Sequence, residues 1–263
     1  MSKVEAKEDF NATKFMINCG EKFDHYMNVF PNTNENIRRI LESFDIKGKR
    51  VLTVLSSGEQ AFNFLNKDAS SVETFDINKL TFYYYYLRVW SIKYFNEFNL
   101  KRSISKLLSV VKAQDKNEQQ AFEFWSNYYL CFGNDIRFLH NNYAPFAGRI
   151  RDLSYLKKRL DEEKFVFYNI DIADKIHLNK KYDIIYASNI PRWILRNHNS
   201  YINFRNNLSK LIEDDGKVIC ANVTRFDDED EINCMSSLFE YHPLEESSDI
   251  GFPRIPGYYY TKK

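Results

Sequence analysis

The stretch from Arg50 to Asp76 constrains the fold of this chain more than any other part of the sequence. Residues 50–55 (RVLTVL) are a short apolar run rich in β-branched side chains, which is typical of a buried parallel strand. A loop with one glycine and a short apolar helix over 61–67 follow, and a second apolar run over 72–75 ends at Asp76. A strand, a loop, a helix and a second strand ending in an acid form the first half of a nucleotide-binding βαβ unit.

The region after Asp76 predicts a long helix and then a helical insertion. The helix runs from Lys79 to about Phe98, and its run of tyrosines, 83–86, spans a full turn. We therefore expect some of these rings in the core and others against the insertion. Residues 100–163 have helical patterns throughout and are rich in basic and aromatic residues. We expect them to cover one end of the sheet, either as a substrate lid or as scaffolding.

The alternation of strands and helices resumes after the insertion. Strands are predicted over 165–170, 181–187 and 217–223, with an amphipathic helix over 200–212 and a turn over 214–216 before the last strand. Residues 232–239 suggest a helix and 257–261 (GYYYT) a closing strand. Residues 1–46 are predicted as N-terminal helices, among them an amphipathic helix from Asn34 to Phe44. The whole chain, 1–263, is expected to form a single α/β domain with a mostly parallel, Rossmann-like sheet.

Charge and cysteine content exclude several classes of protein. The 37 Lys and Arg against 36 Asp and Glu leave a formal charge of +1, which argues against nucleic acid as a partner. No two of the 4 cysteines form a CxxC pair and the 5 histidines are scattered, so we expect no metal site and no disulfide framework. The charged N-terminus and the lack of a long apolar run predict a cytoplasmic protein without a transmembrane segment.

Ligands of an open parallel sheet bind outside the carboxyl ends of its strands, so the residues directly after each strand are the candidates. The candidate residues are Ser56, Ser57, Gly58, Glu59, Gln60, Asp76, Ile77, Asn78, Asp171, Ser188 and Asn189.

Gly58 and Asp76 are the most informative of these candidates. Glycine lacks a Cβ, so the backbone at Gly58 can approach a ligand closely. Asp76 follows Gly58 by 18 positions, near the spacing of about 20 expected for an acid that accepts hydrogen bonds from ribose hydroxyls. The alternatives are a turn glycine and a helix N-cap. With 8 glycines in 263 residues and no GxGxxG fingerprint, the chain favours a nucleoside ligand without a pyrophosphate over NAD or FAD.

The stretch 51–78 (VLTVLSSGEQAFNFLNKDASSVETFDIN) resembles the start of class I, Rossmann-like methyltransferases, which bind S-adenosylmethionine (SAM). More narrowly, SSGEQ at 56–60 and DIN at 76–78 are similar to the DUF3419 family. That family includes the betaine-lipid synthase domain, which transfers the 3-amino-3-carboxypropyl group of SAM. The stretch YASNIPRWI at 186–194 resembles the family's fourth-strand segment. The resemblance does not cover the N-terminal helices or most of the insertion.

The resemblance implies a role for each candidate. Ser57 and Gly58 would line the amino-acid tail of SAM, with Ser56 in the same loop, and Glu59 and Gln60 would contact the ammonium or carboxylate of that tail. Asp76 would hold the ribose with Asn78 beside it, and Ile77 would flank the adenine. Asp171 would contact the adenine amino group, or simply cap a turn. Ser188 and Asn189 would face the sulfonium, and they are the candidate catalytic residues.

These observations predict a SAM-dependent transferase that acts on a small molecule or a lipid headgroup. Transfer of a methyl group and transfer of an aminocarboxypropyl group both remain open. The stretch SNIP at 188–191 invites comparison with the N/D-P-P-Y motif of amine methyltransferases, but Ile190 replaces the first proline. The alternative is a regulatory or assembly module that binds SAM or another adenosine ligand without catalysis. The broader fold also implies a seventh, antiparallel strand, which GYYYT would supply.

Overall fold

The computed structural model describes most of the chain after residue 36. The described residues are 37–136, 152–174, 176–194, 198–221, 235–244 and 257–263, together with Val29, Glu35, Leu139, Ile150 and Asn233. Most of the predicted N-terminal helical region, 1–46, lies outside them.

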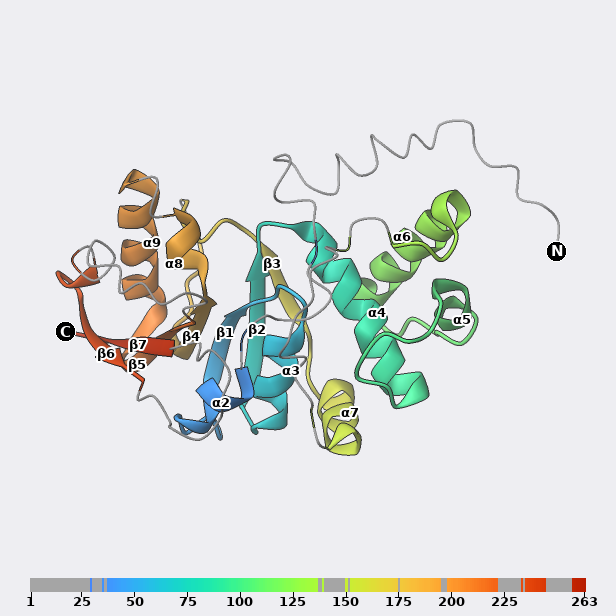
Figure 1. Cartoon of the computed structure of the whole chain (residues 1–263), viewed down its shortest axis with the longest axis horizontal. Helices are drawn as coiled ribbons and strands as arrows, with labels where there is room; N and C mark the ends of the chain where they lie inside the picture. The colour runs from blue at the N-terminus through green and yellow to red at the C-terminus, as the bar shows by residue number, and fades with distance from the viewer. Residues whose placement is uncertain are drawn as a thin grey trace, which may run out of the picture.

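Seven strands among the described residues form one sheet with the order β3-β2-β1-β4-β5-β7-β6 (Figure 1). The strands are β1 (Arg50–Val54), β2 (Ser71–Asp76), β3 (Val166–Asn169), β4 (Tyr182–Ser188), β5 (Ile212–Ala221), β6 (Phe239–Pro243) and β7 (Gly257–Lys262). The pairs from β3 to β5 are parallel, and β7 pairs antiparallel with both β5 and β6. The predicted mostly parallel, Rossmann-like sheet, with GYYYT in an antiparallel strand, is confirmed.

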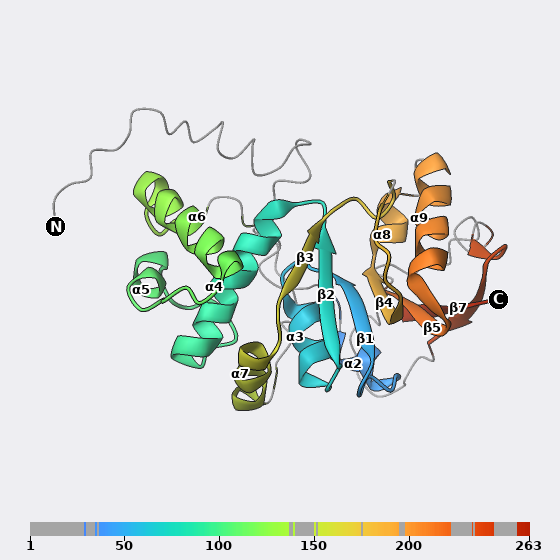
Figure 2. The same ribbon diagram turned by 180° about the vertical axis from the view of Figure 1, so that it is seen from behind.

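The helices are α2 (Ile37–Glu42), α3 (Glu59–Asn66), α4 (Lys79–Phe95), α5 (Ile104–Leu108), α6 (Lys116–Phe132), α7 (Leu153–Glu162), α8 (Ile190–Ile194) and α9 (His198–Leu211). Helix α3 packs on β1 and β2, in front of β2 in Figure 1 and behind it in Figure 2. Helices α8 and α9 lie beside β4 and β5, while α4, α5 and α6 extend beyond the β3 edge.

Two parts of the carboxyl-terminal third differ from the prediction. The turn predicted over 214–216 lies inside β5, where the pairing with β4 jumps from Ile212 opposite Tyr182 to Lys217 opposite Ile184. The turn residues therefore form an irregularity in a strand that continues through them. Strand β6 was not predicted. Among the described residues β6 pairs with β7 alone at the edge of the sheet, so its short sequence carries little of the apolar pattern of a central strand.

The tyrosine run of α4 divides its rings as expected. Tyr83 stacks on Phe124 of α6, with ring centroids 3.8 Å apart. Tyr85 stacks on Phe165, just before β3, at 4.2 Å, and on Phe62 of α3 at 5.0 Å. These rings therefore form part of the core between α4, the sheet edge and the insertion.

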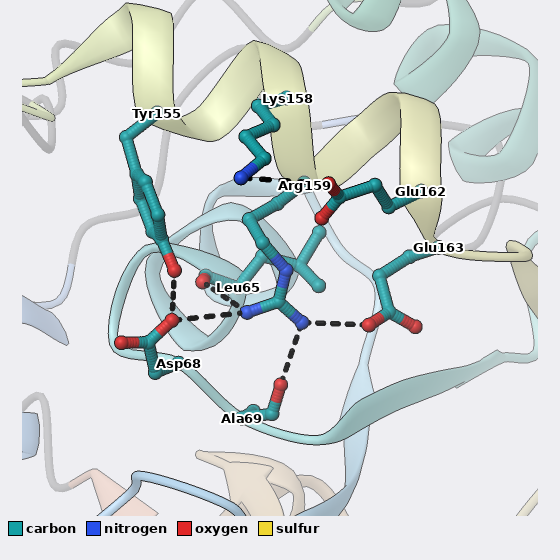
Figure 3. A network of polar contacts seen from close by, with 8 residues as sticks. All are labelled: Leu65, Asp68, Ala69, Tyr155, Lys158, Arg159, Glu162 and Glu163. Atoms are coloured by element: carbon teal, nitrogen blue, oxygen red, sulfur yellow. Dashed lines mark hydrogen bonds and ion pairs between the residues drawn. The ribbon is translucent and has the colours of Figure 1, made fainter.

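The last helix of the insertion packs against α3 at the end of the sheet where β2 begins (Figure 3). Arg159 of α7 donates to the backbone oxygens of Leu65 (3.5 Å) and Ala69 (2.7 Å) and forms ion pairs with Asp68 (3.3 Å) and Glu163 (2.6 Å). We call these five residues the Arg159 network, to which the hydroxyl of Tyr155 is joined through Asp68. Asp76 lies at the opposite end of β2, so a lid role stays a prediction only for other parts of the insertion.

Across the described ranges, no helix combines the length and the apolar character that a membrane crossing requires.

Candidate functional site

The carboxyl ends of β1 and β4 lie side by side, and the order of strands reverses between them. From β1 the chain continues to β2 on one side, while β4 lies on the other. Thr53 of β1 is in register with Tyr186 of β4, so the residues that follow the two strands meet at one edge. A reversal of this kind is where open α/β sheets bind their ligands. The fold thus brings Ser56–Gln60 and Ser188–Asn189 to the expected place.

Asp76 joins the first two loops of this edge. Its Oδ2 accepts a hydrogen bond from the Ser56 amide and its Oδ1 one from the Asn78 amide, both at 2.9 Å. Burial raises the pKa of Asp76 to about 6, against the opposing effect of the hydrogen bonds from Asn78 and Ser56. The Thr81 side chain and the Ile77 amide also interact with this carboxylate, so the hydroxyls of a ligand would share its oxygens with these donors or displace them.

Asn78 caps the helix that follows, so the N-cap alternative raised for Asp76 belongs to Asn78. Its side chain accepts from the Leu80 amide at 2.9 Å. The sequence predicts Asn78 beside the ribose, and in the structure its amide is bonded to Asp76 while its side chain caps α4. Ile77 between them is half-buried.

Two non-glycine residues at this edge have a left-handed backbone. Ser56 follows β1 with φ +47°, and Ser188 ends β4 with φ +55°. Such conformations are strained for residues with a side chain, and they concentrate at functional sites. Their occurrence at the ends of the two strands that flank the reversal supports a ligand site there.

The structure gives a reason for a glycine at position 58 that the sequence did not predict. Its φ is +83°, and a Cβ built on it would lie 2.9 Å from Cδ2 of Tyr85 and 3.4 Å from Phe62. The missing Cβ therefore makes room for the aromatic core. The turn-glycine alternative therefore has its own physical basis, and the approach of a ligand to the Gly58 backbone stays a prediction.

Glu59 is fully buried and forms an ion pair inside the protein. Its Oε1 lies 3.1 Å from Nη2 of Arg88, a buried arginine of α4. The same guanidinium donates to the backbone oxygens of Ser57 (2.9 Å) and Phe98 (3.3 Å). We call these four residues the Arg88 network. It fixes the loop before α3, so the contact between Glu59 and a cofactor tail stays a prediction with a competing partner.

The loop after β2 is held by the last residue of β3, which the sequence analysis did not single out. Asn169 donates from Nδ2 to the backbone oxygens of Asp76 and Ile77, both at 2.9 Å. Asp171 is exposed, and its Oδ1 accepts from the Ala173 amide at 2.8 Å. The turn-capping alternative raised for Asp171 is thus realised, and its contact with an adenine stays a prediction.

Ser188 is bonded to a second residue that the sequence did not single out. Its hydroxyl donates to Oε1 of Glu35 and lies 3.4 Å from Oδ1 of the half-buried Asn189. The hydroxyl of Tyr186 donates to Oε2 of Glu35 at 2.6 Å. Glu35 is 1% exposed. Nothing in its local sequence marks it, because Tyr186 and Ser188 lie about 150 positions away along the chain.

A search of solved structures finds similar chains at low identity. The glycopeptide N-methyltransferase MtfA, in complex with S-adenosylhomocysteine, is 10% identical with a TM-score of 0.49, and the match covers 96% of this chain and 97% of that one. A TehB-like SAM-dependent methyltransferase from Corynebacterium glutamicum is 10% identical with a TM-score of 0.48, covering 88% and 90%. A ribosomal protein L11 methylase from Lactobacillus delbrueckii subsp. bulgaricus is 12% identical with a TM-score of 0.43, covering 87% and 77%. At these scores the likenesses add nothing to the fold that the strand order already defines.

No protein-family model matches the sequence, and no curated protein matches it.

Proposed function

We propose that this chain is a transferase that uses S-adenosylmethionine and binds it across the carboxyl ends of β1, β2 and β4. The observation that carries the proposal is the carboxylate of Asp76. It is buried at the end of β2, it is bonded to the loop after β1, and it lies at the edge where the strand order reverses. A buried carboxylate in that position suits the vicinal hydroxyls of a ribose.

The residues present fit an adenosine ligand with an amino-acid tail better than a dinucleotide. Asp76 would hold the ribose, and the half-buried Ile77 would flank the base. The loop 56–58 and the first turn of α3 would lie beside the tail. A pyrophosphate would need close backbone packing at a glycine-rich turn, whereas the single glycine of this loop, Gly58, has its Cβ position against Tyr85 of the core.

The reaction would depend mainly on positioning. Bound SAM would supply a carbon activated by its sulfonium, so that an acceptor's lone pair forms a bond to that carbon while the carbon–sulfur bond breaks and its electrons pass to sulfur. Ser188 and Asn189 would orient the reacting groups at the end of β4. The surrounding elements would exclude water and hold the acceptor in line, which are the main contributions a protein makes to such a displacement.

Two outcomes of group transfer stay within the proposal. Attack on the methyl carbon gives S-adenosylhomocysteine, and attack on the γ-carbon of the tail gives methylthioadenosine. The class I fold favours the first, and the resemblance to the DUF3419 family favours the second. A small amine or a lipid headgroup is the acceptor that we propose.

Calorimetric titration of the purified protein with SAM, S-adenosylhomocysteine and NAD tests the proposal. We expect the first two to bind and NAD not to bind. Failure of SAM and S-adenosylhomocysteine to bind would contradict the proposal. Product analysis after incubation with candidate amines and lipid headgroups separates the two transfer modes. SAM that binds without being consumed in any such mixture would instead favour a non-catalytic binding module.

A further inference from the structure

Glu35 brings a carboxylate into the centre of the candidate site. It precedes α2 in the chain, yet its carboxylate is bonded to Tyr186 and Ser188 at the end of β4 and to the side chain of Gln60 in the first turn of α3. Two of these partners, Ser188 and Gln60, were assigned to the site from the sequence alone. Glu35 therefore lies between the segment expected beside the cofactor tail and the segment expected beside the reacting sulfur.

Burying a carboxylate in this position costs free energy of folding. The side chain is 1% exposed, and burial raises the pKa of Glu35 while the hydrogen bonds from Ser188, Tyr186 and Gln60 oppose that rise. The nearby Glu59 raises the pKa further, although Glu59 itself is paired with Arg88. An ionisable group kept in a buried position at a ligand-binding edge is a candidate for function.

The chemistry of the proposed cofactor matches such a group. SAM carries two positive centres, the sulfonium and the ammonium of its tail. An ammonium offers three N–H donors to carboxylate oxygens, whereas a sulfonium offers none. Because Gln60 lies in the helix turn expected beside the tail, the contact of Glu35 with Gln60 favours the ammonium over the sulfonium as its partner.

We propose that Glu35 is the residue that binds the ammonium of the cofactor's amino-acid tail, in a site shared with Gln60 and Ser188. This inference rests on the proposed function. It assigns the recognition of the tail's positive charge to Glu35, which lies outside the loops that follow the strands. The resemblance had given that charge to Glu59 or Gln60.

The assignment is tested by measuring how tightly the variant Glu35→Gln binds three ligands that differ in charge. SAM has both positive centres, S-adenosylhomocysteine keeps only the ammonium, and methylthioadenosine has neither. By calorimetry we expect the variant to bind SAM and S-adenosylhomocysteine roughly 10- to 100-fold more weakly, the range for one hydrogen bond to a charged group. Binding of methylthioadenosine should change by less than about twofold.

Any other pattern of affinity losses over the three ligands contradicts the assignment. An equal loss for all three ligands would make Glu35 a structural residue, and a loss confined to SAM would make it a partner of the sulfonium. If wild-type protein binds none of the ligands, the proposed function itself fails, which is a distinct result. If Glu35→Gln does not fold, Glu35→Asp keeps the charge on a shorter side chain. We expect Glu35→Asp to bind methylthioadenosine as wild type does and the other two ligands several-fold more weakly, and an equal loss overturns the proposal.

Glu73→Gln is the matched control. Glu73 of β2 also accepts hydrogen bonds from two tyrosine hydroxyls, Tyr168 at 2.6 Å and Tyr182 at 2.8 Å. It lies three positions before Asp76 and outside the site. We expect Glu73→Gln to leave the affinities for all three ligands within about twofold of wild type. A charge-selective loss in Glu73→Gln would show that the effect is not specific to Glu35.

Discussion

The two ends of α3 are each held by one buried arginine, in very different surroundings. At its start, the Arg88 network joins α4 to the loop that follows β1, with side chains 1% (Arg88) and 0% (Glu59) exposed. At its end, the Arg159 network joins α7 to the turn before β2, with side chains 11% (Arg159) and 45% (Asp68) exposed. One helix thus carries a fully desolvated ion pair beside the candidate site and a partly solvated one at the opposite edge of the sheet (Figure 3).

This difference shows where the fold depends on charge pairing. Breaking a buried ion pair leaves an uncompensated charge in the core, whereas a pair open to water is largely compensated by solvent. The loop after β1 is therefore fixed by an ion pair whose loss strongly destabilises the protein. At the other end of α3, the main contribution of Arg159 is to donate hydrogen bonds to the backbone oxygens of Leu65 and Ala69. We expect variants at the first end to affect stability and binding together, and variants at the second to affect stability alone.

Arg88→Met should have the largest effect. It leaves Glu59 buried without its cation, so we expect the free energy of unfolding to fall by about 3–5 kcal/mol. Urea denaturation followed by circular dichroism measures the change. The double variant Arg88→Met/Glu59→Leu should recover much of the loss, because it removes both charges. A loss below about 1 kcal/mol in the single variant would contradict the account.

Gly58→Ala tests the same end of α3 through its backbone. The substitution imposes a left-handed conformation on a residue with a Cβ and places that Cβ against Tyr85, so we expect a loss of roughly 2–3 kcal/mol. Gly48→Ala is the matched control. Gly48 also has a positive φ, +73°, but no atom within 4 Å of a built Cβ, so it should lose only about 1 kcal/mol. Equal losses would mean that packing against Tyr85 does not constrain Gly58.

Arg159→Met should have the smallest effect. It removes the donors to Leu65 and Ala69, and its ionic partners remain open to solvent, so we expect a loss of about 1–2 kcal/mol in the free energy of unfolding. Affinity for SAM should stay within about twofold of wild type in a calorimetric titration of the folded variant. A loss of affinity as large as that of a site variant would show that the two ends of α3 are coupled.

The sequence predicted the parts of the site that depend on local patterns. The apolar runs on either side of Gly58 placed β1, α3 and β2 with small errors at their ends, and Asp76 followed because it terminates a strand. Apolar periodicity and turn chemistry are properties of short segments, so they can be recognised without knowing the fold.

The parts that were missed depend on contacts between distant segments. Glu35 is bonded to Tyr186 and Ser188, 151 and 153 positions away, and Arg88 to Ser57, 31 positions away. No local pattern specifies these pairs. The sequence also does not show that Glu59 is paired with Arg88 or that Tyr85 lies beside Gly58, and the predicted ligand contacts of these two residues stay predictions.

The pH dependence of SAM binding to wild type and to Asp76→Asn tests the central claim most directly. The carboxylate form of Asp76 accepts hydrogen bonds from a ribose, and with a pKa of about 6 it becomes protonated as the pH falls, so binding must weaken in acid. By calorimetry we expect wild type to bind more tightly than the variant at pH 7, and the ratio of the two affinities to fall about tenfold by pH 5. Equal affinities at pH 7, or a ratio that does not change with pH, would show that Asp76 does not bind the ribose.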